Sequence, residues 1–180
     1  MAEWNNNIIQ QCIKGEHKAQ MQLYTTFYRK VYNSCFRILR DKYDAEDAMQ
    51  ESFIKVFSQL DKYENAVPFE AWIVRIAIHT AIDKLRENKL ELVDCDETNL
   101  YLLEEEDEKE DWEQTLEKVE QVKAAIERLP DTARLIINLY LIEGYDHEEI
   151  AGILNIPAGT VRIQYMRAKQ KLIELIKQRI

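Results

Sequence analysis

The sequence predicts an all-α protein made of two small helical domains that an acidic linker joins. Three observations indicate this fold class. The 180 residues include only four glycines and three prolines, which is few for a sheet-rich fold with many tight turns. Apolar residues recur every three or four positions through long stretches, as they do on the buried face of a helix. A block rich in Asp and Glu separates two such stretches.

The composition indicates a protein that folds in the cytoplasm. Hydrophobic residues make up 46% of the chain and charged residues 32%, which is typical of a globular protein. The first residues lack the pattern of a signal peptide, and no apolar run approaches the roughly 20 residues of a membrane-spanning helix. Three widely separated cysteines, Cys12, Cys35 and Cys95, do not form a disulfide framework or a metal-ligand cluster. We therefore expect a cytoplasmic location without direct membrane insertion.

We expect the first domain to cover residues 1–88 and to begin with two helices. A short helix over residues 6–14 should end at Gly15, because glycine readily adopts the left-handed conformation that follows a helix end. A long amphipathic helix should follow over residues 16–40. Aromatic and basic side chains interleave along it, as they do on some surfaces that bind nucleic acid. We interpret them as a buried stripe flanked by long cationic side chains.

Two more helices should complete the first domain. One is expected over residues 44–60, with Asp44 as its N-cap. Polar residues near its start, Asp47 among them, are mostly acidic, and acidic side chains at that end complement the helix dipole. A loop over residues 61–68 should lead to the last helix, over residues 69–87.

The acidic linker is expected over residues 89–111. Residues 104–111 are all acidic except for one lysine, and a block of like charges repels itself and resists compact folding. Residues 89–122 hold 14 acidic and 3 basic side chains, which more than accounts for the net charge of −9. The rest of the chain therefore carries a small excess of positive charge.

The second domain should cover residues 112–180 and should begin with two apolar helices. Helical periodicity returns at Trp112 and continues as far as Pro130, a residue that a helix interior does not tolerate. A second apolar helix is expected over residues 133–142, and Gly144 should end it.

Two helices around a tight turn are expected over residues 145–172. Asp146 can cap the first of them, and Glu149 can return the hydrogen bond in a capping box. Pro157 should occupy the first position of the second helix. Residues spaced by three or four positions should turn this second helix toward the core: Val161, Tyr165, Ala168, Leu172 and Ile176.

The opposite side of this second helix should face outward, and residues 159–180 carry six Lys or Arg against a single Glu. A short helix, a tight turn and a basic second helix form the helix-turn-helix plan, whose second helix lies in the DNA major groove. The simpler alternative is an αα-hairpin with a solvated basic face. The outward-facing residues are Thr160, Arg162, Ile163, Met166, Arg167 and Gln170.

Two groups of short motifs extend this interpretation to nearly the whole chain outside the acidic linker. The first group is DAEDAMQESF at residues 44–53, FEAWIVRIA at residues 69–77 and DKLR at residues 83–86. The second group is LP at residues 129–130, EG at 143–144, EIA at 149–151, GTVR at 159–162 and RA at 167–168. In their order and separation these motifs resemble the extracytoplasmic-function sigma factors, the minimal class of bacterial promoter-specificity subunit.

The resemblance implies that the protein binds core RNA polymerase. In that family the first domain contacts the clamp helices of the largest polymerase subunit, and the flap of the polymerase is a further contact. Asp47, Gln50 and Glu51 match the clamp-binding positions. Acidic side chains facing a basic partner steer docking and fix its register more than they add affinity. An anti-sigma factor is a further partner that the resemblance implies.

The resemblance also implies two contacts with promoter DNA. The first domain would hold the downstream element as opened single strands, and the matching positions are Lys62, Tyr63, Asn65 and Trp72. His79 stands where the family usually has Asn. The second domain would bind the upstream element as duplex, through Thr160, Arg162, Ile163, Met166 and Arg167. Arginine is suited to this because it can bond a guanine through two hydrogen bonds. No catalytic site, cofactor or metal is implied.

Two other functions are compatible with parts of the sequence. A stand-alone helix-turn-helix regulator would need no first domain and would bind paired half-sites as a dimer. A sigma-like mimic that captures an anti-sigma factor without touching DNA should lack the basic second helix. An enzyme is disfavoured because His17, His79 and His147 are isolated and no glycine-rich phosphate loop is present.

Overall fold

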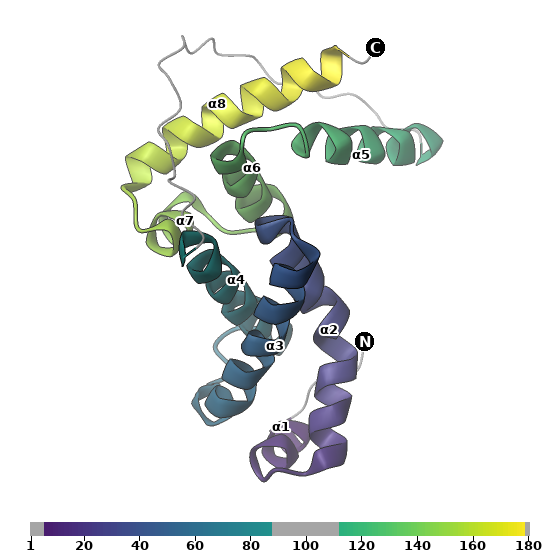
Figure 1. Ribbon diagram of the computed structural model, residues 1–180, viewed down its shortest axis with the longest axis vertical. Coiled ribbons are helices and arrows are strands. Elements are labelled where there is room, and N and C mark those ends of the chain that lie inside the picture. The colour runs from purple at the N-terminus through teal and green to yellow at the C-terminus, as the bar shows by residue number, and fades with distance from the viewer. Residues whose placement is uncertain (1–5, 88–111, 179–180) are drawn as a thin grey trace. The chain divides into compact units, whose positions relative to one another are not determined.

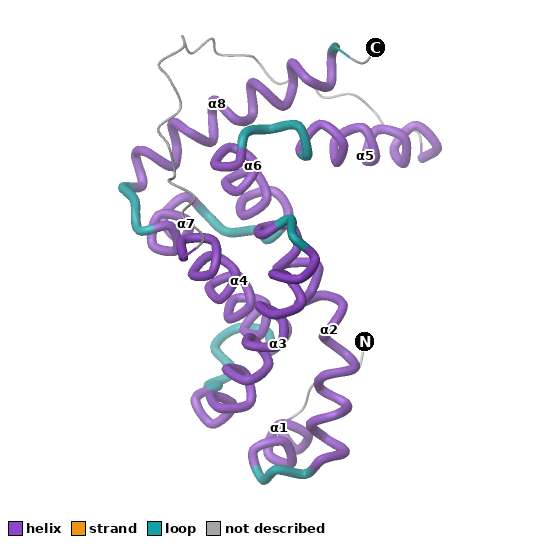
Figure 2. The backbone as a smooth tube through the Cα atoms, in the orientation of Figure 1, coloured by secondary structure: helices purple, strands orange, loops and turns teal. Residues whose placement is uncertain are grey.

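The computed structural model describes residues 6–87 and 112–178 (Figure 1). In these residues every regular element is helical and no strand occurs, which confirms the all-α prediction (Figure 2). The chain divides into a first unit, Met1–Glu91, and a second unit, Leu92–Ile180. The acidic linker expected over residues 89–111 lies outside the described residues. No described helix combines the length and the apolar character that crossing a membrane requires.

The first unit is a bundle of three long helices with a short helix at one end. Helices α2, α3 and α4 each pack against the other two, and α1 packs on α2 and on a 3₁₀ turn, η1 (Figure 1). The elements of this unit are α1 (Asn6–Ile13), α2 (His17–Leu39), α3 (Lys42–Gln59), η1 (Leu60–Lys62) and α4 (Phe69–Glu87).

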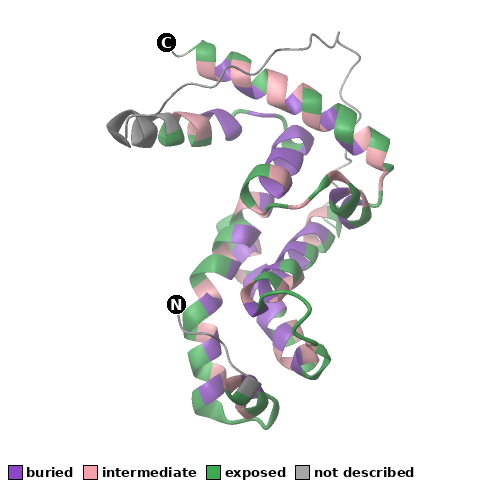
Figure 3. Ribbon diagram, turned by 180° about the vertical axis from the view of Figure 1, so that it is seen from behind, coloured by how far each residue is buried: buried purple, intermediate pink, exposed green. Residues whose placement is uncertain are grey.

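Small residues in the core let the long helices of the first unit pack closely. Ala45 and Ala48 of α3 and Ala77 and Ala81 of α4 are completely buried. The distance between packed helices depends on the size of the side chains at the contact, and alanine keeps it short. Larger side chains from α2, such as the fully buried Leu23, fill the remaining core. The buried residues therefore lie on one side of each helix, and the opposite sides are left for other roles (Figure 3).

The turn between α2 and α3 differs from the prediction in its cap. Asp41, not Asp44, is the N-cap, and its Oδ1 accepts hydrogen bonds from the backbone N–H of Tyr43 (2.8 Å) and of Asp44 (2.9 Å). Arg40 ends α2 in the left-handed conformation, with φ of 58°. The connection is so short that α3 starts at Lys42, and Asp44 falls inside its first turn.

The second unit is built around α8. This long helix packs against α5, α6 and α7 (Figure 1). The elements are α5 (Trp112–Ile126), α6 (Asp131–Ile137), a π-helical turn η2 (Asn138–Ile142), α7 (His147–Leu154) and α8 (Ala158–Lys177). The single helix predicted over residues 133–142 is therefore an α-helix that continues into a π-turn. A hydrogen bond that spans five residues, from the Glu143 N–H to the Asn138 carbonyl (3.0 Å), marks that turn.

The core of the second unit is apolar and includes one residue that periodicity missed. Val161, Ala168 and Leu172 are buried as predicted, and Tyr165 and Ile176 are half-buried. Leu175 is buried as well, because the last turns of α8 lie against both α5 and α6. The cluster beneath these turns consists of Ala125, Ile126, Leu129, Ala133, Ile137, Ala168, Leu172 and Leu175.

A buried arginine closes the connection between α5 and α6. Arg134 is only 5% exposed. Its guanidinium donates one hydrogen bond to the carbonyl of Leu129 (3.0 Å) and pairs with Asp131. A buried cation is tolerated only when it is paired and hydrogen-bonded. Arg134 therefore fixes the sharp turn at Pro130.

The helix-turn-helix prediction is confirmed, including its capping box. The Glu149 N–H donates to Asp146 Oδ1 (2.8 Å), and the Asp146 N–H donates to Glu149 Oε2 (3.1 Å). α7 ends at Asn155, whose φ of 56° is left-handed. Pro157 is the N-cap of α8 and not its first residue, one position earlier than predicted.

Replacement of Asp146 by Ala should destabilise the second unit, because it removes the carboxylate that accepts the hydrogen bond from the Glu149 N–H. We expect a loss of about 1 kcal/mol in the free energy of unfolding, as is typical of lost N-caps. Chemical denaturation of the full chain would measure it. Asp146→Ser is the matched control, because serine also caps helices. Equal loss in both variants would contradict the assignment.

Candidate functional site

The outer face of α3 carries the three predicted acidic and amide residues together. Asp47, Gln50 and Glu51 are exposed and spaced by one turn, so they share one side of the helix. Tyr43 (79% exposed) and Ile54 (69% exposed) continue this face at its two ends. This face therefore has a polar centre with one exposed apolar side chain at each end. We call these five residues the α3 face.

Two residues of the α3 face are also engaged inside the unit. Lys84 of α4 pairs with Asp47 and lies 3.5 Å from Asp44. The hydrogen bond to Asp47 raises the pKa of Lys84 above its usual value. Glu51 pairs with Lys55 at 2.7 Å, one turn along the helix. The Asp47 carboxylate thus connects α3 to α4 while part of it remains open to solvent.

A groove between α2 and α3 adjoins the α3 face at Gln50. Its volume is about 440 Å³, and it is lined by Tyr24, Tyr28, Arg29, Tyr32, Asn33, Glu46, Met49 and Gln50. Tyr24 stacks on Tyr28 with ring centroids 5.8 Å apart. Helical periodicity predicts that the aromatic residues of this helix lie in the core. The available signal was the one-residue offset of these tyrosines from the buried Leu23 and Phe27, because both series repeat every four residues.

The loop before α4 is folded over an aromatic cluster. The Tyr63 ring lies 5.0 Å from Phe69 and 5.4 Å from Trp72, and Phe69 stacks on Trp72 at 5.8 Å. The Tyr63 hydroxyl donates to the Val67 carbonyl (2.7 Å), which closes the loop. Asn65, at the loop tip, has a left-handed φ of 57°.

The structure brings two of the four predicted strand-binding residues into contact. Tyr63 and Trp72 are half-buried in the aromatic cluster, whereas Lys62 and Asn65 are exposed nearby in the chain. The Tyr63 ring and hydroxyl both have partners within the protein. Lys62 and Asn65 present their side chains to solvent instead.

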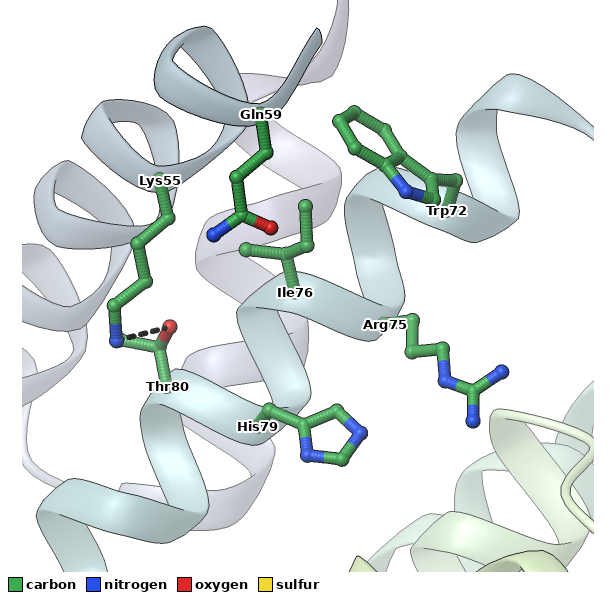
Figure 4. A pocket seen from close by; sticks show the side chains of 7 residues that line it. All are labelled: Lys55, Gln59, Trp72, Arg75, Ile76, His79 and Thr80. Atoms are coloured by element: carbon green, nitrogen blue, oxygen red, sulfur yellow. Dashed lines mark hydrogen bonds between the residues drawn. The ribbon is translucent and has the colours of Figure 1, made fainter. Parts of the chain in front are cut away.

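A pocket next to Trp72 combines aromatic and cationic groups. Its volume is about 270 Å³, and it is lined by Lys55, Gln59, Trp72, Arg75, Ile76, His79 and Thr80. Lys55 and Gln59 come from α3, and the other residues come from α4 (Figure 4). The Lys55 ammonium donates to the Thr80 hydroxyl (3.2 Å), which holds it at one side of the pocket. Sequence spacing does not predict Lys55 and Arg75 as neighbours of Trp72 in this pocket, because Lys55 lies on α3 and Arg75 lies beyond the predicted loop on α4.

His79 of this pocket favours its neutral form. Partial burial, with a smaller effect of the Arg75 charge, lowers the pKa of His79 below its usual value of 6.5, and Asp83 opposes this shift. The pocket therefore takes up a proton less readily than an isolated histidine would. A bound anion would reverse this preference, because a negative charge stabilises the imidazolium.

The predicted DNA-facing residues lie on the outer side of α8. Arg162, Ile163 and Met166 are exposed, and Thr160 and Arg167 are half-buried. Arg162 pairs with Glu148 of α7. This side of α8 therefore offers an arginine and two apolar side chains to a partner.

An aromatic cluster, not predicted from the sequence, joins η2 to the two helices of the helix-turn-helix. The rings of Tyr140, His147 and Tyr165 come from η2, α7 and α8 respectively. Their centroids lie 4.3 to 5.2 Å apart. The contacts fix the start of α7 against α8. In the described part of the chain, no three His, Cys, Asp or Glu side chains are placed to hold a metal ion.

Replacement of His79 by Gln should reduce the acid sensitivity of the fold. Because the pKa of His79 is lowered in the folded state, the unfolded chain binds a proton first as the pH falls below about 6.5. The stability that neutral His79 contributes is present above this pH and is lost below it. Melting temperatures between about pH 7.5 and 5.5 should fall less in the variant than in the wild type. An identical fall in both proteins would refute this.

Comparison with protein families matches both units. The family model described as Sigma-70 region 2 matches residues 23–91, and the one described as Sigma-70, region 4 matches residues 119–172. The ECF RNA polymerase sigma factor SigW of Bacillus subtilis (strain 168) is 31% identical over 172 residues, 91% of this chain and 92% of that protein. The ECF RNA polymerase sigma-E factor of Escherichia coli (strain K12) is 31% identical over 173 residues, 92% of this chain and 90% of that protein.

Solved structures agree on the fold. CnrH in complex with the cytosolic domain of CnrY matches with a TM-score of 0.54 and 20% identity, over 95% of this chain and 96% of that one. The sigma factor RpoE, in complex with the anti-sigma factor NepR from Bartonella quintana, matches with a TM-score of 0.55 and 20% identity, over 87% and 96%. Both matched sigma regions and the two relatives of similar length lead to one conclusion: the chain belongs to the extracytoplasmic-function (ECF) sigma factors of RNA polymerase.

Proposed function

We propose that this sigma factor divides its work between its two units. As an ECF sigma factor, the chain directs core RNA polymerase to promoters. The first unit would bind the polymerase and the opened downstream element, and the second would bind the upstream element as duplex. The observation that carries the proposal is the placement of the acidic α3 face and the basic outer side of α8 in different units.

The α3 face is the proposed polymerase-binding surface. Its polar centre would steer a basic partner, and Tyr43 and Ile54 would supply the apolar contacts that usually carry most of the binding free energy. The groove between α2 and α3 extends the same surface, because Gln50 belongs to both. The tyrosines that line this groove suit an interface because they combine apolar area with a polar hydroxyl.

Replacement of Ile54 by Lys should weaken the binding of core polymerase by about tenfold, because it removes an apolar contact and places a cation against a basic partner. Titration of labelled chain with core polymerase would measure the affinity. Met21→Lys is the matched control, because Met21 is 49% exposed on α2 and lies outside the α3 face. The proposal fails if both variants bind like the wild type or lose affinity equally.

The pocket beside Trp72 is the proposed surface for opened DNA. Strand opening costs a few kcal/mol for each unstacked base, and the protein must recover this cost by binding the exposed strand. Stacking of a base on an aromatic ring contributes roughly 1–3 kcal/mol, and nearby cations can contact the backbone. Trp72 with Lys55 and Arg75 provides this combination.

Replacement of Trp72 by Ala should impair strand opening more than duplex binding. We expect a loss of roughly 1–3 kcal/mol in open-complex formation, which is the contribution of one stacking ring. Permanganate reactivity of promoter thymines, compared with footprinting of the closed complex at low temperature, would separate the two steps. Trp72→Phe keeps an aromatic ring on Tyr63 and should recover part of the activity. Equal losses in both steps would count against this assignment.

The outer side of α8 is the proposed surface for duplex DNA. Arg162 can contact a guanine edge or a phosphate, and Ile163 or Met166 can contact a thymine methyl. Replacement of Arg162 by Ala should cost about 1–3 kcal/mol in promoter binding and leave the affinity for core polymerase unchanged. Footprinting of the holoenzyme, together with the polymerase titration, would test both statements. A variant that loses polymerase binding would refute the division of labour.

We also propose that the chain acts by binding alone, in the cytoplasm, and that an anti-sigma factor restrains it. The similarity to a sigma factor solved with the anti-sigma factor NepR supports this partner through the fold. The match of both sigma regions disfavours a stand-alone helix-turn-helix regulator, which would need only the second unit. Run-off transcription with purified core polymerase is the decisive experiment. A chain that confers no start-site selection would refute the proposed function.

A further inference from the structure

One ion pair joins the two helices of the helix-turn-helix. Glu148 lies in the first turn of α7, and Arg162 lies near the start of α8. The Nη2 of Arg162 donates to Oε1 of Glu148, and the two side chains are 59% and 61% exposed. The pair therefore lies at the surface that the second unit is proposed to turn toward DNA.

Folding stability does not account for this pairing. Exposed ion pairs contribute little to stability, because water screens the charges and the side chains lose freedom. Glu148 is favourable at the start of α7 in any case, because a carboxylate there complements the helix dipole. The capping box consists of Asp146 and Glu149, so Glu148 is not needed for the cap.

The geometry limits how Arg162 can approach DNA. A guanidinium carries five N–H donors in a rigid plane, and one of its terminal nitrogens donates to Glu148. The pair favours side-chain orientations that leave the remaining donors free for a two-pronged contact with guanine O6 and N7. The backbone on either side is also fixed. His147, next to Glu148, packs on Tyr165, which follows Arg162 by one turn of α8.

The charge of Glu148 acts against contacts that carry no sequence information. Phosphate attracts Arg162 in any DNA sequence, and such contacts dominate non-specific binding. A carboxylate paired with Arg162 reduces this attraction and is itself repelled by phosphates. A guanine edge carries no net charge, so Glu148 can remain paired while Arg162 binds it.

We propose that Glu148 determines sequence specificity by orienting Arg162 toward a guanine and by weakening its attraction to phosphates. Glu148 is thus a positioning residue that acts through Arg162. The inference rests on the proposed role of the outer side of α8 in binding duplex DNA.

The test compares holoenzymes that carry wild-type chain or Glu148→Gln. Each selects duplexes from a library randomised over the upstream element, and sequencing gives the base preference at every position. We expect the preference for guanine at one position to fall about 3–10-fold in Glu148→Gln. We also expect non-specific duplex binding to tighten by a similar factor, and its salt dependence to steepen by about one counterion.

Two further variants make the outcome specific. In the Arg162→Ala background, Glu148→Gln should change neither the base preference nor the salt dependence, because its effect runs through Arg162. Glu174→Gln is the matched control, since Glu174 forms an exposed pair with Lys171 elsewhere on α8. It should leave the base preference unchanged.

The inference is overturned if Glu148→Gln leaves the base preference intact, or if its effect persists without Arg162. The two proposals fail separately. If Arg162→Ala has no effect on duplex selection, the role of α8 itself is wrong. If Arg162→Ala relaxes selection and Glu148→Gln does not, only the inference about Glu148 is wrong.

Discussion

The burial of one stripe of α3 against α2 and α4 is the constraint on which the first unit depends. Ala45 and Ala48 have no exposed surface, so the rotation of α3 about its axis is fixed. Asp47 and Ile54 must then point away from the core. The same contact places the Lys55 side of α3 beside α4, where it forms one wall of the pocket shown in Figure 4. The burial of this one stripe of α3 thus determines the position of both the α3 face and the pocket wall.

In the second unit, the burial of one side of α8 plays the corresponding role. Val161 and Leu172 bury one side of α8, and the short turn from Asn155 to Pro157 limits where α7 can lie. The rings of Tyr140 and Tyr165 then pack on His147 and hold the start of α7 in place. Arg162 is exposed on α8, and the packing of α7 against α8 fixes the backbone around it.

Within residues 6–87 and 112–178, periodicity, caps and helix-breaking residues are sufficient to predict the α-helices and most of their boundaries. They failed where the outcome depends on contacts between distant residues. The cap of α3 moved to Asp41 because of the short turn after Arg40, and the π-turn that ends at Ile142 has no clear signal in local propensity. Likewise, Lys84 lies 37 residues from Asp47, so no sequence spacing predicts their pairing. The contacts of the proposed site residues with polymerase and with DNA remain predictions.

The two carboxylates around Lys84 have a consequence for how a cationic partner can dock on α3. Asp47 is largely solvent-accessible, whereas Asp44 lies deeper and 3.5 Å from the same ammonium group. If a cation of the proposed partner pairs with Asp47, Lys84 keeps Asp44 as a counter-ion. The exchange leaves no uncompensated charge at the junction of α3 and α4, so association at this surface need not loosen the bundle beneath it.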